Sequence, residues 1–161
     1  KLSSYYSAIS SFAAQAVDAG ADGLVLFNRF YAADIDLKTQ RLVSALDLST
    51  PADQRVALRW VGILRSQLPP SVSLACTSGV HSADEVIKAV LVGADVACTT
   101  SAVMQRGARA VTEMLEGTSA WLQQQGLDSI SEARGRMSLG PNGSPAVYER
   151  AQYLEVIKGE W

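Results

Sequence analysis

Apolar residues recur along this chain in two alternating patterns, one typical of helices and one typical of short buried strands. The helical spacing of three or four residues occupies four segments, at residues 4–18, 52–67, 83–92 and 103–116. Short, mostly apolar runs separate them, at residues 23–28, 72–76 and 95–99. Such runs are typical of parallel strands that are buried on both faces. Helices and strands that alternate in this way predict an α/β fold with a parallel sheet.

Two further stretches interrupt this alternation. Residues 29–52 are long for a connection and have room for a short strand pair, and long loops in compact domains are often functional. After residue 116 the βα units stop, and 117–161 is expected to be a helical tail. Helical patterns there cover about 118–125 and 129–136, and a last helix is expected to begin at Ser144.

Composition narrows the classes of function. The chain has 161 residues and a net charge of −2, which gives no basic surface for nucleic acid. No apolar run approaches the roughly 18–20 residues of a membrane helix, and no signal-peptide pattern is present. We therefore expect a cytoplasmic protein. Cys76 and Cys98 lie in strand-like runs and are expected to be buried, reduced thiols, and no metal-ligand spacing occurs.

The residues that follow the predicted strands are the candidates for chemistry, because catalysis in parallel α/β proteins occurs at the carboxyl ends of strands. They are Lys1, Asn28 with Arg29, Thr77 to Val80, and Thr99 to Ser101. The last two sets are small, hydroxyl-bearing turns whose backbone N–H groups can approach a phosphate. Ordinary βα turns remain an equally open interpretation. His81 is expected at a helix entry in solvent, and no nucleophile–base pair supports hydrolase chemistry.

Several stretches, in order, resemble the dihydroorotate dehydrogenase family, and most closely its bacterial dihydroorotate dehydrogenase-like branch. These stretches cover almost the whole chain: Lys1-Leu2-Ser3, Gly20 to Tyr31, Leu58-Arg59-Trp60, Ser78 to Asp84, Gly93 to Val96 and Glu149 to Tyr153. The resemblance implies a (β/α)8 TIM barrel that holds flavin mononucleotide (FMN) at its mouth. A complete barrel has eight strands and about 250 residues. The chain would then be the C-terminal half, about strands five to eight, as a single partial domain.

The resemblance also assigns roles to individual residues. Lys1 matches a strand-five lysine that approaches the flavin ring, and Asn28, with Arg29 beside it, matches a strand-six position near flavin and a pyrimidine-like substrate. The FMN phosphate would be held by two turns, Ser78-Gly79-Val80 after strand seven and Thr100-Ser101 after strand eight. The catalytic base would lie in the N-terminal half, so no catalytic residue is expected in this chain. The implied reaction is oxidation of dihydroorotate to orotate in pyrimidine biosynthesis.

The chain departs from the family pattern at the phosphate-binding positions. Ser78 and Thr100 replace glycines, and the glycine-rich loop after strand six has no clear counterpart, so Ser49 and Thr50 are expected to occupy its space. Three hypotheses follow: an FMN oxidoreductase completed by the N-terminal half of the same barrel, a non-catalytic flavin- or phosphate-binding paralogue, and a half-barrel that assembles with itself, for example as a homodimer.

Overall fold

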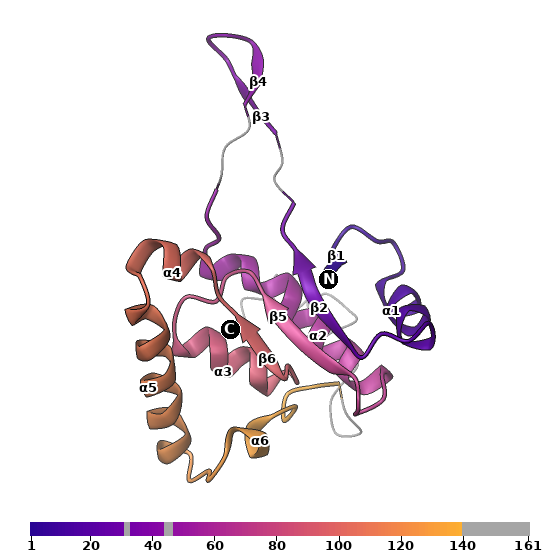
Figure 1. Ribbon diagram of the computed structural model, residues 1–161, viewed down its shortest axis with the longest axis vertical. Helices are drawn as coiled ribbons and strands as arrows, with labels where there is room; N and C mark the ends of the chain where they lie inside the picture. Colours follow the sequence, from indigo (N-terminus) through magenta and orange to yellow (C-terminus); the bar gives the residue numbers. More distant parts are fainter. Residues whose placement is uncertain (31–32, 44–46, 140–161) are drawn as a thin grey trace, which may run out of the picture.

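The computed structural model describes residues 1–30, 33–43 and 47–139. Its centre is a parallel sheet with the strand order β1-β2-β5-β6 (Figure 1). The strands are β1 (Leu2–Ser3), β2 (Gly23–Asn28), β5 (Ser73–Thr77) and β6 (Val96–Cys98). This arrangement confirms the predicted α/β class with a parallel sheet. The last helix expected from Ser144 lies outside the described residues.

Helices α1 (Ile9–Asp18), α2 (Gln54–Gln67) and α3 (Ala83–Leu91) follow the strands, and a 3-10 turn, η1 (Pro51–Asp53), precedes α2. Figure 1 shows α2 and α3 on the same face of the sheet. The largest fully buried side chains include Ile9, Leu26, Leu64 and Leu74, so the core lies between the sheet and these helices.

The expectation that the strands are buried on both faces is wrong for the described part of the chain. Leu24 and Leu26 of β2 are buried, whereas Val25 between them is only half-buried. In β6, Val96 is 51% exposed. Side chains alternate between the faces of a strand, so this pattern shows that the described helices cover only one face.

The predicted helix over 103–116 is two helices, α4 (Ser101–Arg106) and α5 (Arg109–Gln124). Gly107 separates them with a φ of +70° and a ψ of −167°, a conformation outside the helical region that glycine adopts readily. The helix predicted separately over 118–125 is the continuation of α5 through Gly117. A Cβ at Gly117 would lie 2.6 Å from the Ala83 Cβ, so this glycine lets α5 approach α3 closely. The first helix begins at Ile9 rather than residue 4, and the one expected over 129–136 is the short α6 (Ile130–Ala133).

The long segment after β2 contains a short strand pair, as the sequence allowed for residues 29–52. Strands β3 (Asp34–Asp36) and β4 (Arg41–Val43) form an antiparallel hairpin that projects away from the sheet (Figure 1). Its apolar side chains Leu37 and Leu42 are exposed. None of the described helices is long and apolar enough to cross a membrane.

Asp95 joins several elements at the end of the sheet opposite the hairpin. Its carboxylate lies 2.7 Å from Arg65 of α2 and 3.1 Å from Arg134, which follows α6. The same carboxylate accepts a hydrogen bond from the backbone N–H of Leu74 in β5. One side chain therefore links β5, α2 and the α6 segment.

Candidate functional site

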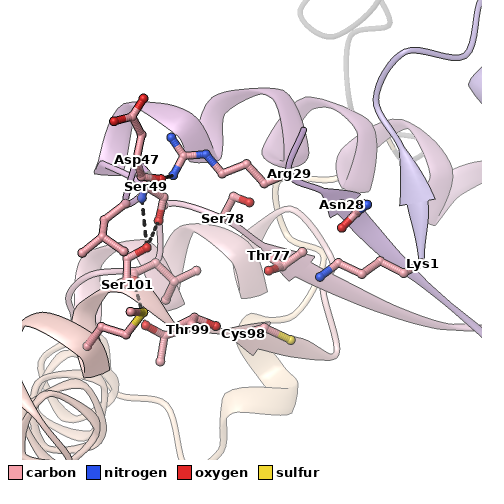
Figure 2. Close-up of a pocket in the computed structure, with 15 residues that line it drawn as sticks. Lys1, Asn28, Arg29, Asp47, Ser49, Thr77, Ser78, Cys98, Thr99 and Ser101 are labelled. Carbon is pink, nitrogen blue, oxygen red and sulfur yellow. Dashed lines mark hydrogen bonds between the residues drawn. The ribbon is translucent and has the colours of Figure 1, made fainter. Parts of the chain in front are cut away.

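The carboxyl ends of the strands surround a pocket of about 190 Å³ (Figure 2). All eight residues predicted to bind cofactor or substrate line it: Lys1, Asn28, Arg29, Ser78, Gly79, Val80, Thr100 and Ser101. The parallel strands bring these residues together from positions as far apart as 1 and 101. The pocket also contains Asp47, Leu48 and Ser49, from the segment that returns from the hairpin.

The turn after β5 has an unusual backbone. Ser78 has a φ of +75° and Gly79 a φ of +76°, so two consecutive residues adopt the left-handed conformation. Glycine adopts this conformation readily, whereas a serine is strained in it. A Cβ at Gly79 would lie 2.6 Å from the Gln54 backbone N and 2.7 Å from the Thr50 carbonyl O. Gly79 is therefore required by both conformation and space, while Ser78 keeps a glycine-like backbone and adds a hydroxyl.

Lys1, Asn28 and Thr77 lie at one end of the pocket, and Figure 2 shows the Lys1 side chain extending toward the other two. Arg29 extends instead toward the segment that returns from the hairpin. Its Nη1 donates a hydrogen bond of 2.5 Å to the Asp47 carbonyl O, and its Nη2 lies 4.0 Å from the Asp53 carboxylate. Arg29 therefore joins the two ends of the hairpin segment.

Ser49 and Ser101 form a buried hydrogen-bonded pair at the other end of the pocket (Figure 2). The Ser101 hydroxyl oxygen accepts hydrogen bonds from the Ser49 backbone N–H at 2.9 Å and from the Ser49 hydroxyl at 2.8 Å. The Ser49 hydroxyl also lies 3.4 Å from Nε2 of His81. His81 is half-buried, so the expectation that it stands in solvent is only partly right.

Further hydrogen bonds hold the two predicted phosphate turns against each other. The Thr99 hydroxyl donates to the Val80 carbonyl O at 2.7 Å. Arg106 at the end of α4 donates to the His81 carbonyl O and pairs with Glu113 of α5 at 3.0 Å. Thr100 is exposed at the start of α4 and makes no side-chain cap there. The turns are thus tied together, and Thr100 is an exposed residue at the rim of the pocket.

The titratable groups near the pocket include one shifted acid and one shifted thiol. A hydrogen bond from the Thr50 backbone N–H lowers the pKa of Asp53 more than partial burial raises it, and the Thr50 hydroxyl, Arg29 and His81 act in the same direction. Burial raises the pKa of Cys76 to about 11, so this thiol stays protonated and unreactive at neutral pH. Both cysteines are free thiols; Cys76 is buried, as expected, whereas Cys98 is only half-buried. Among the described residues, no group of three His, Cys, Asp or Glu could hold a metal.

The fold and the pocket together define an α/β protein whose site is formed by small, hydroxyl-bearing turns at the carboxyl ends of parallel strands. No protein-family model matches the chain. It is 32% identical over 146 residues to the catalytic subunit of dihydroorotate dehydrogenase B (NAD⁺) from Pelobacter propionicus. It is 33% identical over 141 residues to the subunit of the same name from Trichlorobacter lovleyi. Each match covers 85% of this chain and 45% of the relative.

A solved structure supports the fold. The crystal structure of a ligand-free DHODH from Eimeria tenella superposes with a TM-score of 0.65 and 16% identity, over 83% of this chain and 38% of that one. The two relatives at 32% and 33% identity confirm the family resemblance inferred from the motifs: the chain is a homologue of the dihydroorotate dehydrogenases. It spans about half the length of the curated relatives that it matches.

Proposed function

We propose that this chain is the C-terminal half of the barrel of an FMN-dependent oxidoreductase that resembles dihydroorotate dehydrogenase. The observation that carries the proposal is that the eight residues matched to the family's flavin and substrate positions line a single pocket. Homology over 85% of the chain supports the same activity class. The division expected from the sequence, with βα units over 1–116 and a helical tail over 117–161, falls inside α5, so on this proposal the βα units extend to the end of that helix. The cytoplasmic location expected from the sequence stays a prediction.

The size and exposure of the pocket support the proposal that the N-terminal half of the barrel contributes the rest of the site. Pockets for small molecules and cofactors usually enclose about 300–1,000 Å³. At about 190 Å³, this pocket is smaller than that range, and the uncovered face of the sheet lies beside it. The N-terminal half of the same barrel would cover this face and complete both the flavin site and the substrate site.

The residues present fit the parts of FMN. FMN would supply the redox chemistry by accepting a hydride from the substrate. The ammonium group of Lys1 would stabilise negative charge on the reduced ring. The amide of Asn28, beside Arg29, would hydrogen-bond a pyrimidine-like substrate. The Ser78-Gly79-Val80 turn and the Thr100-Ser101 turn would hold the phosphate through backbone N–H groups and hydroxyls.

The first test uses the complete protein that contains this chain. It should be purified with bound FMN and show the absorption bands of oxidised flavin. Dihydroorotate should bleach these bands, and Lys1→Met should slow the bleaching while FMN stays bound. As a control, Lys38→Met on the hairpin should leave the rate unchanged. A complete protein that takes up no FMN would contradict the proposal.

A second candidate is a non-catalytic flavin- or phosphate-binding paralogue, which is favoured by one observation. Ser78 occupies a position with a glycine-like backbone and brings a side chain into the pocket. Under this hypothesis FMN binds, yet no pyrimidine reduces it. Turnover of dihydroorotate with any electron acceptor would eliminate this candidate.

Assembly of the half-barrel with itself is a third hypothesis, favoured by the uncovered face of the sheet. A second copy would then cover that face and pair with the sheet edges. Light scattering of this chain alone should show a dimer. A monodisperse monomer that binds no apolar dye would contradict self-assembly.

A further inference from the structure

The hydrogen bonds of Ser101 leave its own hydroxyl proton unassigned. A serine hydroxyl has one donor and two acceptor positions. Both acceptor positions of Ser101 are filled by Ser49, from its backbone N–H at 2.9 Å and its hydroxyl at 2.8 Å. The backbone N–H of Ser49 can only donate, so that bond has a fixed direction. In this arrangement the Ser101 proton points away from Ser49.

His81 determines which way the pair of hydroxyls is polarised. Its Nε2 lies 3.4 Å from the Ser49 hydroxyl. When Nε2 carries a proton and donates it, the Ser49 hydroxyl donates to Ser101, and Ser101 donates onward. When Nε2 is an acceptor, the Ser49 hydroxyl donates to Nε2 instead. The Ser101 hydroxyl then donates to the Ser49 oxygen and no longer points into the pocket. A hydrogen bond from Arg106 to the His81 carbonyl O holds this residue in place.

We propose that Ser49 is a positioning residue, which orients the Ser101 hydroxyl as a donor into the pocket toward a phosphate oxygen. This inference rests on the proposed function and deepens it by assigning a role to the segment that returns from the hairpin. Both serines line the pocket and both are buried, so their relative orientation is fixed by packing. The anionic oxygens of a phosphate accept such a donor strongly, since hydrogen bonds to charged groups are the stronger ones.

The arrangement also explains how the site accommodates the loss of glycines. Ser78 and Thr100 carry side chains where the family pattern has glycines, which restricts the approach of backbone N–H groups to phosphate. A directed hydroxyl from Ser101 replaces part of that interaction. Ser49 does not contact the ligand in this scheme, so its effect passes entirely through Ser101.

The test compares FMN with riboflavin, which differs only in lacking the phosphate. Dissociation constants are measured by flavin fluorescence for the complete wild-type protein and for Ser49→Ala. The substitution should weaken FMN binding about tenfold and change riboflavin binding less than twofold. Ser66→Ala is the matched control, because it removes a hydroxyl bonded to the Ile63 carbonyl O, outside the residues that line the pocket. It should change neither constant.

Variants of Ser101 and His81 test whether Ser49 acts through the Ser101 hydroxyl. Ser101→Ala should show the same selective loss, and adding Ser49→Ala to it should cause no further loss, because both act through one hydroxyl. His81→Gln, which keeps a donor in place of Nε2, should bind FMN better than His81→Ala. Equal weakening of FMN and riboflavin by Ser49→Ala, or no weakening of either, would overturn the inference.

Failure of the proposed function gives a different result. If the wild-type protein binds no flavin, the proposed function is wrong, and thermal stabilisation by inorganic phosphate then tests the serine pair directly. Phosphate should stabilise the wild type and Ser66→Ala but not Ser49→Ala. A wild-type protein that responds to neither flavin nor phosphate would overturn the inference as well.

Discussion

Replacing Gly79 by alanine should destabilise the protein strongly, for two separable reasons. A residue with a Cβ loses about 1–2 kcal/mol in the left-handed conformation that Gly79 adopts at a φ of +76°. The new Cβ would also lie 2.6 Å from the Gln54 backbone N and 2.7 Å from the Thr50 carbonyl O. Because these are backbone atoms, relieving the overlap costs about 1–3 kcal/mol more. Alanine lowers the entropy of the unfolded chain, which offsets up to about 1 kcal/mol.

The expected net loss is about 2–4 kcal/mol in the free energy of unfolding. Urea titration of the complete protein, followed by circular dichroism, measures it. Gly126→Ala is the matched control, because Gly126 has a similar φ of +65° and a Cβ there would have no neighbour within 4 Å. It should lose only about 1 kcal/mol. If the two variants are equally stable, Gly79 is not packed against Thr50 and Gln54, and our account of this turn is wrong.

Three other substitutions test separate features. Ser78→Gly relieves the strain at a φ of +75° and should leave the unfolding midpoint unchanged or higher, whereas Ser78→Val should lower it. Asp95→Ala removes the partner of Arg65 and Arg134 and should cost about 2–3 kcal/mol, measured by urea unfolding; a loss below 0.5 kcal/mol, as for an exposed pair, would contradict the linking role. Burial tends to raise the pKa of Glu85, but hydrogen bonds from Ser82 and the charge of Lys88 outweigh it, so the pKa is lowered and the stabilisation is lost as the pH falls through it. Glu85→Gln should therefore be less stable than wild type at pH 7, and the gap should close in acid; a gap independent of pH would refute this.

Three of the four strands of the sheet, β2, β5 and β6, could be predicted from the sequence because each is a short apolar run that ends in polar residues, whereas β1 is only two residues long and shows no such pattern. The breaks in helices could not be predicted in the same way. Gly107 and Gly117 both interrupt amphipathic stretches, and only Gly107 ends a helix. The difference is three-dimensional, because α5 passes Ala83 at Gly117 and needs a residue without a side chain there.

The candidate site shows a similar division. The residues at strand ends were identified because parallel strands place their carboxyl ends at one edge. The pairing of Ser49 with Ser101 joins residues 52 positions apart, and it depends on where the chain returns from the hairpin. The family resemblance placed Ser49 near the site, and the pocket includes it, but nothing in the residue types signals its pairing with Ser101. The left-handed backbone of Ser78 could not be predicted from the residue type either, because serine rarely adopts it. It is consistent with the glycine that the family has at this position.

The hydrogen bond from Arg29 to the Asp47 carbonyl O has a consequence for how this protein tolerates changes in length. It closes a loop between two residues that are 18 positions apart in the chain, and both of these residues line the pocket. Doubling the length of a closed flexible loop adds only about 0.6 kcal/mol to its entropic cost. The hairpin is therefore a natural insertion point. Its length and sequence can change, in natural relatives or by design, while the pocket keeps its geometry.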